Sequence, residues 1–407
     1  MTSKRNRTLT ALAYNGVPIF PVKRLRVGVL YGGRSGEHEV SLASAAAVFA
    51  NLDRQRYEPV AVRIEKDGRW VLADRPPSAS SAAEVIEQTR SEVARVRGGR
   101  EVFLPPRPGE ETLVLVDRRS SRADEAEAAA ALTGLRLDVI FPVLHGPYGE
   151  DGTIQGLLEL ANVAYVGCGV LASAVGMDKA VMKVLFRAHG LPVCDWIVVR
   201  RRAWRTAPRT VATTVEETLS YPLFVKPANM GSSVGISKVH EPAELGAAFD
   251  QAFEFDRKVI VEAAVVDARE IECAVLGNEA AEASVPGEIV PSREFYDYQA
   301  KYIDGHSRLE IPAQLDDELA REVKRLSIVA FDVIDGSGLA RVDFLLSRAT
   351  GALYLNEINT LPGFTTISMY SKLWAASGVP YATLVDRLIA LAIERHTEKQ
   401  ELKTNVF

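Results

Sequence analysis

The chain has 407 residues, of which 47% are hydrophobic and 25% are charged, and these values are typical of a globular protein with about two to four domains. Its formal net charge of −5 argues against a nucleic-acid-binding surface, and no apolar run approaches the ~18 residues of a membrane-spanning helix. The three cysteines are too widely spaced for a metal site or a disulfide framework, which predicts a location in the reducing cytoplasm.

The first residues of the chain, 1–24, are basic, and Pro18 and Pro21 interrupt their apolar part. They contain neither a continuous apolar segment nor a small-residue cleavage site, so they do not resemble a signal peptide. We predict a flexible N-terminal arm.

A βαβ unit follows the arm. Residues 26–31 form a short apolar strand, 32–36 (Gly-Gly-Arg-Ser-Gly) a turn, about 39–51 a helix, and 58–64 a second strand. This order predicts a parallel sheet. The glycine spacing does not match G-x-G-x-x-G, so dinucleotide binding is not indicated.

Residues 76–135 are rich in Ser, Ala, Pro, Arg and Glu, which predicts an insertion that is partly helical and partly loop. A buried-strand pattern resumes at 138–144 and ends in a glycine-rich turn at 145–152. Ligands of open α/β sheets bind at the carboxyl ends of strands, so this turn is a candidate binding segment. The N-terminal α/β domain is predicted to cover residues 25–171.

Glu37 and His145 each lie close behind a strand of this domain. Glu37 is a candidate for binding a substrate ammonium group, and His145 can share the same pocket. The alternatives are a helix-dipole interaction for Glu37 and a structural hydrogen bond for His145.

The pattern changes at about residue 172. A helix is predicted to carry Met177-Asp178-Lys179, and a strand ending at Lys226 enters the loop 229–235 (Asn-Met-Gly-Ser-Ser-Val-Gly). Small residues let backbone N–H groups cradle phosphates, but the loop lacks the Lys-Ser/Thr of a P-loop. An ordinary hairpin loop and a solvated lysine remain the alternatives.

Glu262 ends the next predicted strand and Glu270 begins the one after it. They are candidates to accept hydrogen bonds from an adenine amino group and from ribose hydroxyls, and surface carboxylates are the alternative. A long loop with four aromatic residues, 292–307, a helix at 316–334 and a C-terminal helix at about 378–396 are also predicted.

Two short strands between those helices carry the strongest chemical signal, Arg341-Val342-Asp343 and Glu357-Ile358-Asn359. The turn-rich segment 347–351 predicts that they form a hairpin. Because side chains alternate along a strand, the first and third residues of each would share a face. Two carboxylates, an amide oxygen and a guanidinium suit Mg²⁺ and a transferring phosphoryl group, although a half-solvated sheet face is the alternative. The N–H of Gly363, in the next turn, is placed to meet an oxyanion.

Eight motifs together resemble one family. They are 32–41 (GGRSGEHEVS), 144–146 (LHG), 149–156 (GEDGTIQG), 177–179 (MDK), 231–235 (GSSVG), 295–302 (FYDYQAKY), 341–343 (RVD) and 356–363 (NEINTLPG). From about Val27 to the C-terminal helix, the chain resembles the D-alanine:D-alanine ligases, which are ATP-grasp enzymes of bacterial cell-wall synthesis.

The resemblance implies an α/β fold in which an N-terminal, Rossmann-like parallel-sheet domain precedes a two-lobed α+β ATP-grasp domain. The central lobe would cover residues 172–264, and the C-terminal lobe 265–407, with the metal site and a lid loop at 292–307. The family also implies a cytoplasmic homodimer.

The implied reaction joins two D-alanines into D-alanyl-D-alanine through a D-alanyl phosphate, giving ADP and phosphate, for peptidoglycan precursor synthesis. ATP would be the co-substrate, with two Mg²⁺ ions, or Mn²⁺ in their place. The implied metal ligands are Asp343, Glu357 and Asn359. The implied ATP-binding residues are Lys179, Lys226, Ser232, Ser233, Glu262, Ala263, Val265, Glu270 and Lys301. The implied D-alanine-binding residues are Glu37, His145, Lys301, Ser368 and Met369. The implied catalytic residues are Glu37, Ser232, Tyr302, Arg341 and Gly363.

Three alternatives remain at this point. A D-alanine:D-lactate ligase is the first, although many such enzymes carry histidine where this chain has Tyr302. Another ATP-grasp carboxylate–amine ligase is the second, and the set Glu37, His145 and Ser368 argues against it. The third is a nucleotide-binding regulator without turnover, which D-alanine-dependent ADP formation would exclude.

Overall fold

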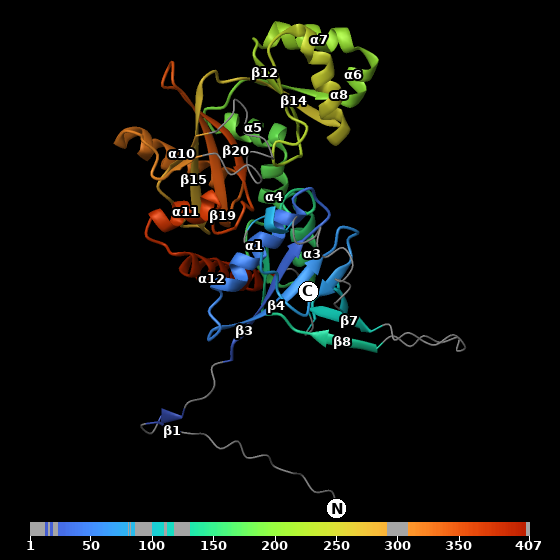
Figure 1. Ribbon diagram of the computed structural model, residues 1–407, viewed down its shortest axis with the longest axis vertical. Coiled ribbons are helices and arrows are strands. Elements are labelled where there is room, and N and C mark those ends of the chain that lie inside the picture. The colour runs from blue at the N-terminus through green and yellow to red at the C-terminus, as the bar shows by residue number, and fades with distance from the viewer. Residues whose placement is uncertain are drawn as a thin grey trace, which may run out of the picture.

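The computed structural model describes residues 13–14, 17–18, 23–79, 81, 83–85, 100–109, 112–117, 131–290 and 308–403. They form sheets of eight, four and six strands, and a small pair of two-residue strands, β1 (Ala13–Tyr14) and β2 (Val17–Pro18) (Figure 1). The predicted lid loop lies outside the described residues, as does most of the N-terminal arm.

The N-terminal sheet has the strand order β10-β9-β3-β4-β5-β6-β7-β8. Its parallel half, which confirms the predicted βαβ unit, consists of β3 (Leu25–Gly32), β4 (Tyr57–Ile64), β9 (Val139–Pro142) and β10 (Ala164–Tyr165). Helices α1 (His38–Asn51) and α3 (Thr153–Ala161) belong to this half.

The second half of this sheet is antiparallel and lies mostly in the insertion. It consists of β5 (Trp70–Leu72), β6 (Arg100–Phe103), β7 (Leu113–Asp117) and β8 (Ala131–Leu135). The insertion was predicted to be partly helix and partly loop, and residues 83–85 are helical, but the prediction missed the strands β6 to β8. Val102, Leu113 and Leu115 are buried, so short strands with weak local signals are stabilised by pairing at the sheet edge.

Two helices lead from this sheet to the central one, α4 (Val170–Met177) and α5 (Lys179–Ala188). A single helix through Met177-Asp178-Lys179 was predicted, but the helix breaks at Asp178, whose backbone is extended (φ −88°, ψ 92°). The Asp178 carboxylate accepts a hydrogen bond from the Val181 N–H and so caps α5, which favours a break over a continuous helix.

The central sheet is antiparallel, with the order β11-β14-β12-β13. Its strands are β11 (Trp196–Arg200), β12 (Leu223–Pro227), β13 (Ser237–Val239) and β14 (Lys258–Ala263). The accompanying helices are α6 (Arg201–Thr206), α7 (Pro208–Thr218), the short 3₁₀ helix η1 (Pro242–Glu244) and α8 (Leu245–Phe255). Phe249 and Phe253 of α8 are buried against this sheet.

The C-terminal sheet has the order β18-β17-β15-β19-β20, with β16 paired to β15. Its strands are β15 (Ala268–Gly277), β16 (Glu282–Ala283), β17 (Gly287–Val290), β18 (Arg308–Glu310), β19 (Gly338–Ser347) and β20 (Leu353–Asn359). The predicted β19–β20 hairpin is confirmed.

The two faces of this sheet have different coverings. Helix α10 (Asp317–Val333) packs on one face, where Ile271, Cys273 and Val342 are buried. On the other face, Leu276 and Leu339 are buried near helix α11 (Met369–Ala376), and further along the same strands the side chains become charged. The charged part of this face forms one wall of the site described below.

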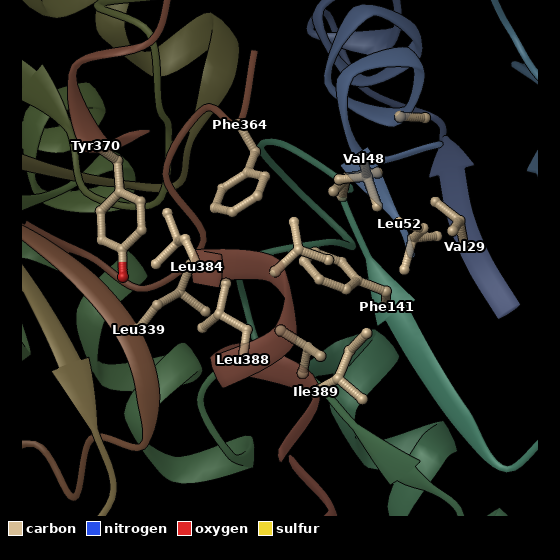
Figure 2. Close-up of a cluster of buried hydrophobic side chains, with 14 of the residues drawn as sticks. Val29, Val48, Leu52, Phe141, Leu339, Phe364, Tyr370, Leu384, Leu388 and Ile389 are labelled. Atoms are coloured by element: carbon tan, nitrogen blue, oxygen red, sulfur yellow. The ribbon is translucent and has the colours of Figure 1, made fainter. Parts of the chain in front are cut away.

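Helix α12 (Tyr381–Gln400) joins the first and last sheets. In Figure 2 its Leu384, Leu388 and Ile389 lie between Phe141 of the N-terminal sheet and Leu339 of the C-terminal sheet. All five side chains are almost fully buried, and each contributes about 1.5–3 kcal/mol on burial. One continuous core therefore holds the two sheets around the site.

Among the described residues, no single helix is long and apolar enough to cross a membrane, and α11 and α12 pass such a test only as a pair with a 103° bend between them. Cys168, Cys194 and Cys273 are free and buried, as expected for small apolar side chains.

Candidate active site

A cavity of about 170 Å³ lies where the N-terminal sheet, the loop after β12 and the C-terminal sheet meet. Ten of the predicted site residues line it: Glu37, His145, Lys179, Ser232, Arg341, Glu357, Asn359, Gly363, Ser368 and Met369. Residues from widely separated parts of the chain therefore converge on this cavity. Lys301 and Tyr302 lie outside the described residues.

The β19–β20 hairpin forms the acidic wall. In its register Arg341 is opposite Asn359 and Asp343 is opposite Glu357. The Arg341 guanidinium donates two hydrogen bonds of 2.7 Å to the Asp343 carboxylate. The Asn359 Oδ1 atom accepts from the Leu361 N–H at 3.0 Å. The predicted oxygen ligands thus lie on one face of the hairpin, beside the guanidinium of Arg341.

A third carboxylate, Glu272 of β15, extends this wall and was missed by sequence reasoning. It is opposite Asp343 in the β15–β19 register, and its Oε2 atom lies 3.1 Å from Arg341 Nε. Glu272 follows Glu270 at the spacing of residues that share a strand face, but that alternation does not indicate that their strand pairs with β19.

The loop between β12 and β13 forms the opposite wall. Lys179, the first residue of α5, donates from its backbone to Ala228 O and from its Nζ atom to Met230 O at 2.8 Å. The same Nζ atom lies 3.3 Å from Glu357 Oε2, so Lys179 links this loop to the acidic wall. Ser232 and Ser233 both have positive φ angles, 51° and 59°. Left-handed backbone at two consecutive non-glycine residues is uncommon and typical of functional loops.

Glu37 bridges from the N-terminal sheet to this loop. The Ser232 hydroxyl donates a hydrogen bond to Glu37 Oε1. Gly146 lies against the same carboxylate, because a Cβ atom there would be 2.6 Å from Glu37 Oε2, and its φ is +77°. The positive φ favours glycine at position 146, and the absence of a side chain there leaves room for the Glu37 carboxylate.

His145 is almost fully buried next to Glu37. Its Nε2 atom is 2.9 Å from the Ser44 hydroxyl, and its Nδ1 atom is 3.2 Å from Leu361 O and 3.7 Å from Glu150 Oε1. Burial alone lowers the pKa of a histidine, but the carboxylates of Glu150 and Glu37 outweigh it and raise the pKa of His145 above its usual value. His145 is thus an electrostatic partner of Glu150 and of Glu37, the carboxylate that was predicted to bind an ammonium group.

Two of the predicted D-alanine-binding residues, Ser368 and Met369, lie at the start of α11. Ser368 precedes the helix, and its Oγ atom accepts from the Thr365 N–H at 3.0 Å. A Cβ atom at Gly363 would lie 3.2 Å from this oxygen, so the Gly363 backbone and the Ser368 hydroxyl are neighbours. Met369 adds an apolar side chain beside them. A polar group and an apolar contact are therefore presented together.

The nucleotide-binding candidates on the central sheet meet at Glu262. Its Oε2 atom is 2.6 Å from Lys226 Nζ, and its Oε1 atom pairs with Lys183 of α5, which sequence reasoning missed. Burial raises the pKa of a carboxyl group, but Lys183 and Lys226 outweigh it and hold the pKa of Glu262 below its usual range. Glu262 therefore remains a carboxylate.

Three other nucleotide-binding candidates lie on or between β14 and β15. The Ala263 N–H donates to Asp195 O and is used within the sheet. Glu270 lies on β15, two residues before Glu272, and is opposite Leu345 of β19 and Ile289 of β17. Val265 lies in the short connection between β14 and β15.

Comparison with known proteins identifies the family. Residues 26–168 match the D-ala D-ala ligase N-terminus and residues 185–390 match the D-ala D-ala ligase C-terminus. The chain belongs to the D-alanine–D-alanine ligase family. It is 51% identical to the D-alanine--D-alanine ligase of Heliobacterium modesticaldum over 93% of this chain and 97% of that one.

Solved structures of the family agree with the fold. The D-alanine-D-alanine ligase from Coxiella burnetii is 36% identical, with a TM-score of 0.76 over 93% of this chain and 97% of the other. The VanG D-Ala:D-Ser ligase from Enterococcus faecalis is 32% identical, with a TM-score of 0.76 over 91% and 100%. The resemblance and the fold class predicted from the sequence are thus confirmed.

Proposed function

We propose that this member of the family ligates two D-alanines into D-alanyl-D-alanine in the cytoplasm, with conversion of ATP into ADP and phosphate, for peptidoglycan precursor synthesis. One observation carries the proposal most directly. The Glu37 carboxylate, suited to an ammonium group, is hydrogen-bonded to Ser232 of the phosphate-loop candidate, in the same cavity as Arg341 and Glu357. An amino acid and a phosphoryl group would therefore be held side by side.

The residues of the site position the substrates and stabilise the charges that develop during the reaction. Glu37, supported by His145, binds the ammonium of the first D-alanine, whose carboxylate attacks the γ-phosphate of ATP, displaces ADP and becomes D-alanyl phosphate. The amine of the second D-alanine then attacks the acyl phosphate, loses a proton and displaces phosphate. Arg341 and the Gly363 N–H stabilise the oxyanion, while Ser368 holds the second carboxylate. Ser232 and Tyr302 complete the proposed proton-handling group with Glu37.

The donor set on the acidic wall fits Mg²⁺, or Mn²⁺ in its place. Asp343, Glu357 and Asn359 lie on two paired strands and supply the hard oxygen atoms that Mg²⁺ prefers. Within the described ranges, no three His, Cys, Asp or Glu side chains are grouped to hold an ion alone. The proposed set therefore depends on the Asn359 amide and on nucleotide oxygens. When bound, two Mg²⁺ ions would neutralise charge on the phosphates.

We also propose a homodimer, on the basis of exposed apolar side chains on three consecutive helices. Leu160 of α3, Leu171 of α4 and Val184 of α5 are 61%, 58% and 56% exposed. Exposed apolar side chains of this size are candidates for burial in an interface. Sedimentation analysis should give twice the chain mass for the wild type and a smaller value for Leu171→Asp, and a monomeric wild type would refute the dimer.

ADP release with Mg²⁺-ATP tests the reaction. D-alanine alone should support release and yield the dipeptide between pH 6 and 9, whereas L-alanine should not. Parallel reactions with added D-lactate or D-serine, analysed by mass spectrometry, identify the second substrate. Release that requires D-lactate would establish the depsipeptide ligase instead, and ATP binding without release under any condition would indicate a regulator.

A further inference from the structure

Lys183 is a buried lysine that the proposed reaction does not use. Its side chain, on α5, is 2% exposed and pairs with the 3% exposed Glu262 carboxylate of β14. A buried lysine is costly unless it is paired, so its position at this carboxylate has a structural or functional reason.

The carboxylate of Glu262 has two partners with different surroundings. Lys226 lies on β12, the strand that leads into the phosphate-loop candidate, and its side chain is 11% exposed. Burial lowers the pKa of Lys226, but Glu262, and to a smaller extent Glu357 on the acidic wall, outweigh it and raise that pKa. Lys226 therefore interacts electrostatically with carboxylates of both the central and the C-terminal sheet. Of the two lysines that pair with Glu262, Lys183 is the more deeply buried.

Phosphate binding would change the pairing of Lys226 with Glu262. A nucleotide phosphate near the loop offers Lys226 a stronger anionic partner than a carboxylate that is already paired. If Lys226 were the sole partner of Glu262, its departure would leave a carboxylate buried alone, and that carboxylate would take up a proton.

We propose that Lys183 is a positioning residue that keeps Glu262 ionised and correctly placed for the nucleotide base while Lys226 binds phosphate. The inference depends on the proposed nucleotide site, in which Glu262 accepts a hydrogen bond from the adenine amino group. An ionised carboxylate accepts from that amino group and repels the carbonyl oxygen that guanine carries at the same position. A protonated carboxyl group donates to that oxygen and loses the discrimination. Lys183 thus determines the preference for adenine over guanine.

Equilibrium binding of ATP and GTP tests this role without requiring turnover. Lys183→Met should raise the Kd for ATP at least tenfold and lower the preference for ATP over GTP by a similar factor. The fold should survive, because Lys226 still pairs with Glu262 in the unliganded protein. Lys183→Gln, which also lacks the charge, should behave in the same way and gives a second route if Lys183→Met is poorly folded.

The matched control is Arg187→Met. Arg187 lies one turn later on α5 and pairs with Asp195 at 2.8 Å in a far more exposed setting. Its substitution should leave both Kd values within twofold of the wild type. An unchanged ATP-to-GTP preference in folded Lys183→Met or Lys183→Gln would overturn the proposal and make the ion pair purely structural.

The double variant Glu262→Gln/Lys183→Met tests whether Lys183 acts through Glu262. With a neutral amide at position 262, removal of Lys183 should change the preference less than twofold, because coupled residues are not additive. If Lys183→Met lowers the ATP-to-GTP preference as much in the Glu262→Gln protein as in the wild type, Lys183 does not act through Glu262. If the wild-type protein binds ATP in preference to GTP but does not turn over D-alanine, the proposed function is refuted and the role of Lys183 is not.

Discussion

The two walls of the proposed nucleotide site carry opposite excesses of charge. On the central sheet one carboxylate, Glu262, is paired with two lysines, whereas on the C-terminal sheet one guanidinium, that of Arg341, contacts the carboxylates of Glu272 and Asp343. The first group has one positive charge in excess and the second has one negative charge in excess.

This difference follows the ligands that each wall is proposed to bind. Buried charges are costly unless they are balanced, and a group of three ions cannot balance itself. A lysine excess leaves one cation for phosphate oxygens, and a carboxylate excess leaves one anion for a divalent metal. The lysine group is also the drier one, since the Lys183 and Glu262 side chains are 2% and 3% exposed and the Arg341 side chain is 17% exposed.

The largest effect is expected from Glu357→Gln, which removes an anion from the acidic wall. We expect kcat to fall by about 10³-fold or more, because the metal contributes several kcal/mol of charge stabilisation. Steady-state ADP release measures it. Glu322→Gln, an exposed carboxylate paired with Arg325 on α10, is the control. Activity within tenfold of the wild type would contradict the metal assignment.

Lys226→Met removes the cation excess from the other wall and leaves Glu262 paired with Lys183. The KM for ATP should rise by about 10–100-fold, the amount expected for one lost charged hydrogen bond. Initial rates over a range of ATP concentrations measure this rise. Lys238→Met, on the neighbouring strand β13, is the matched control. If the two variants have the same KM, Lys226 does not contact phosphate.

Glu272→Gln reduces the carboxylate excess without removing a proposed metal ligand. Arg341 then keeps Asp343 as its main partner and competes with the metal for it. We expect the Mg²⁺ concentration for half-maximal rate to rise by about tenfold, as for other groups that orient metal ligands. A magnesium titration of ADP release measures this change, and a curve that matches the wild type would remove Glu272 from the site.

The smallest effect concerns His145, whose pKa in the folded protein is raised by Glu150 and Glu37 against the effect of burial. A raised pKa stabilises the fold below the unfolded value near 6.5, and this contribution is lost as pH rises through the folded pKa. The difference in free energy of unfolding between wild type and His145→Gln, from urea titrations, should therefore be larger at pH 5.5 than at pH 8.5. An equal difference at both pH values would show that His145 is neutral throughout.

The sequence predicted the acidic wall well because its signal is local. Alternation in Arg341-Val342-Asp343 and Glu357-Ile358-Asn359 defines a face, and a turn between them defines the partner strand. Glu272 carries the same alternation, but nothing local indicates which strand lies beside β15. Glycine-rich motifs likewise located Gly146 and the 229–235 loop, since close approach to a carboxylate or positive φ angles restrict the residue type.

Other features could not be predicted from a local pattern. The strands β6 to β8 have weak signals of their own and are stabilised by pairing with a sheet edge formed elsewhere in the chain. The break at Asp178 depends on competition between a continuous helix and a capping hydrogen bond to the Val181 N–H. Helix periodicity alone does not decide such a competition.

By itself the sequence determined the family, the fold class and the oxygen-rich hairpin, because these depend on residue type and on spacing along the chain. Only the tertiary structure decided how the buried charges are paired. In the sequence, Lys183 is only one polar residue of a predicted helix. In the folded protein it is paired with Glu262 of β14. The cost of burying an unpaired charge then makes that pairing a property of the packed molecule, and the segment around either residue does not specify it.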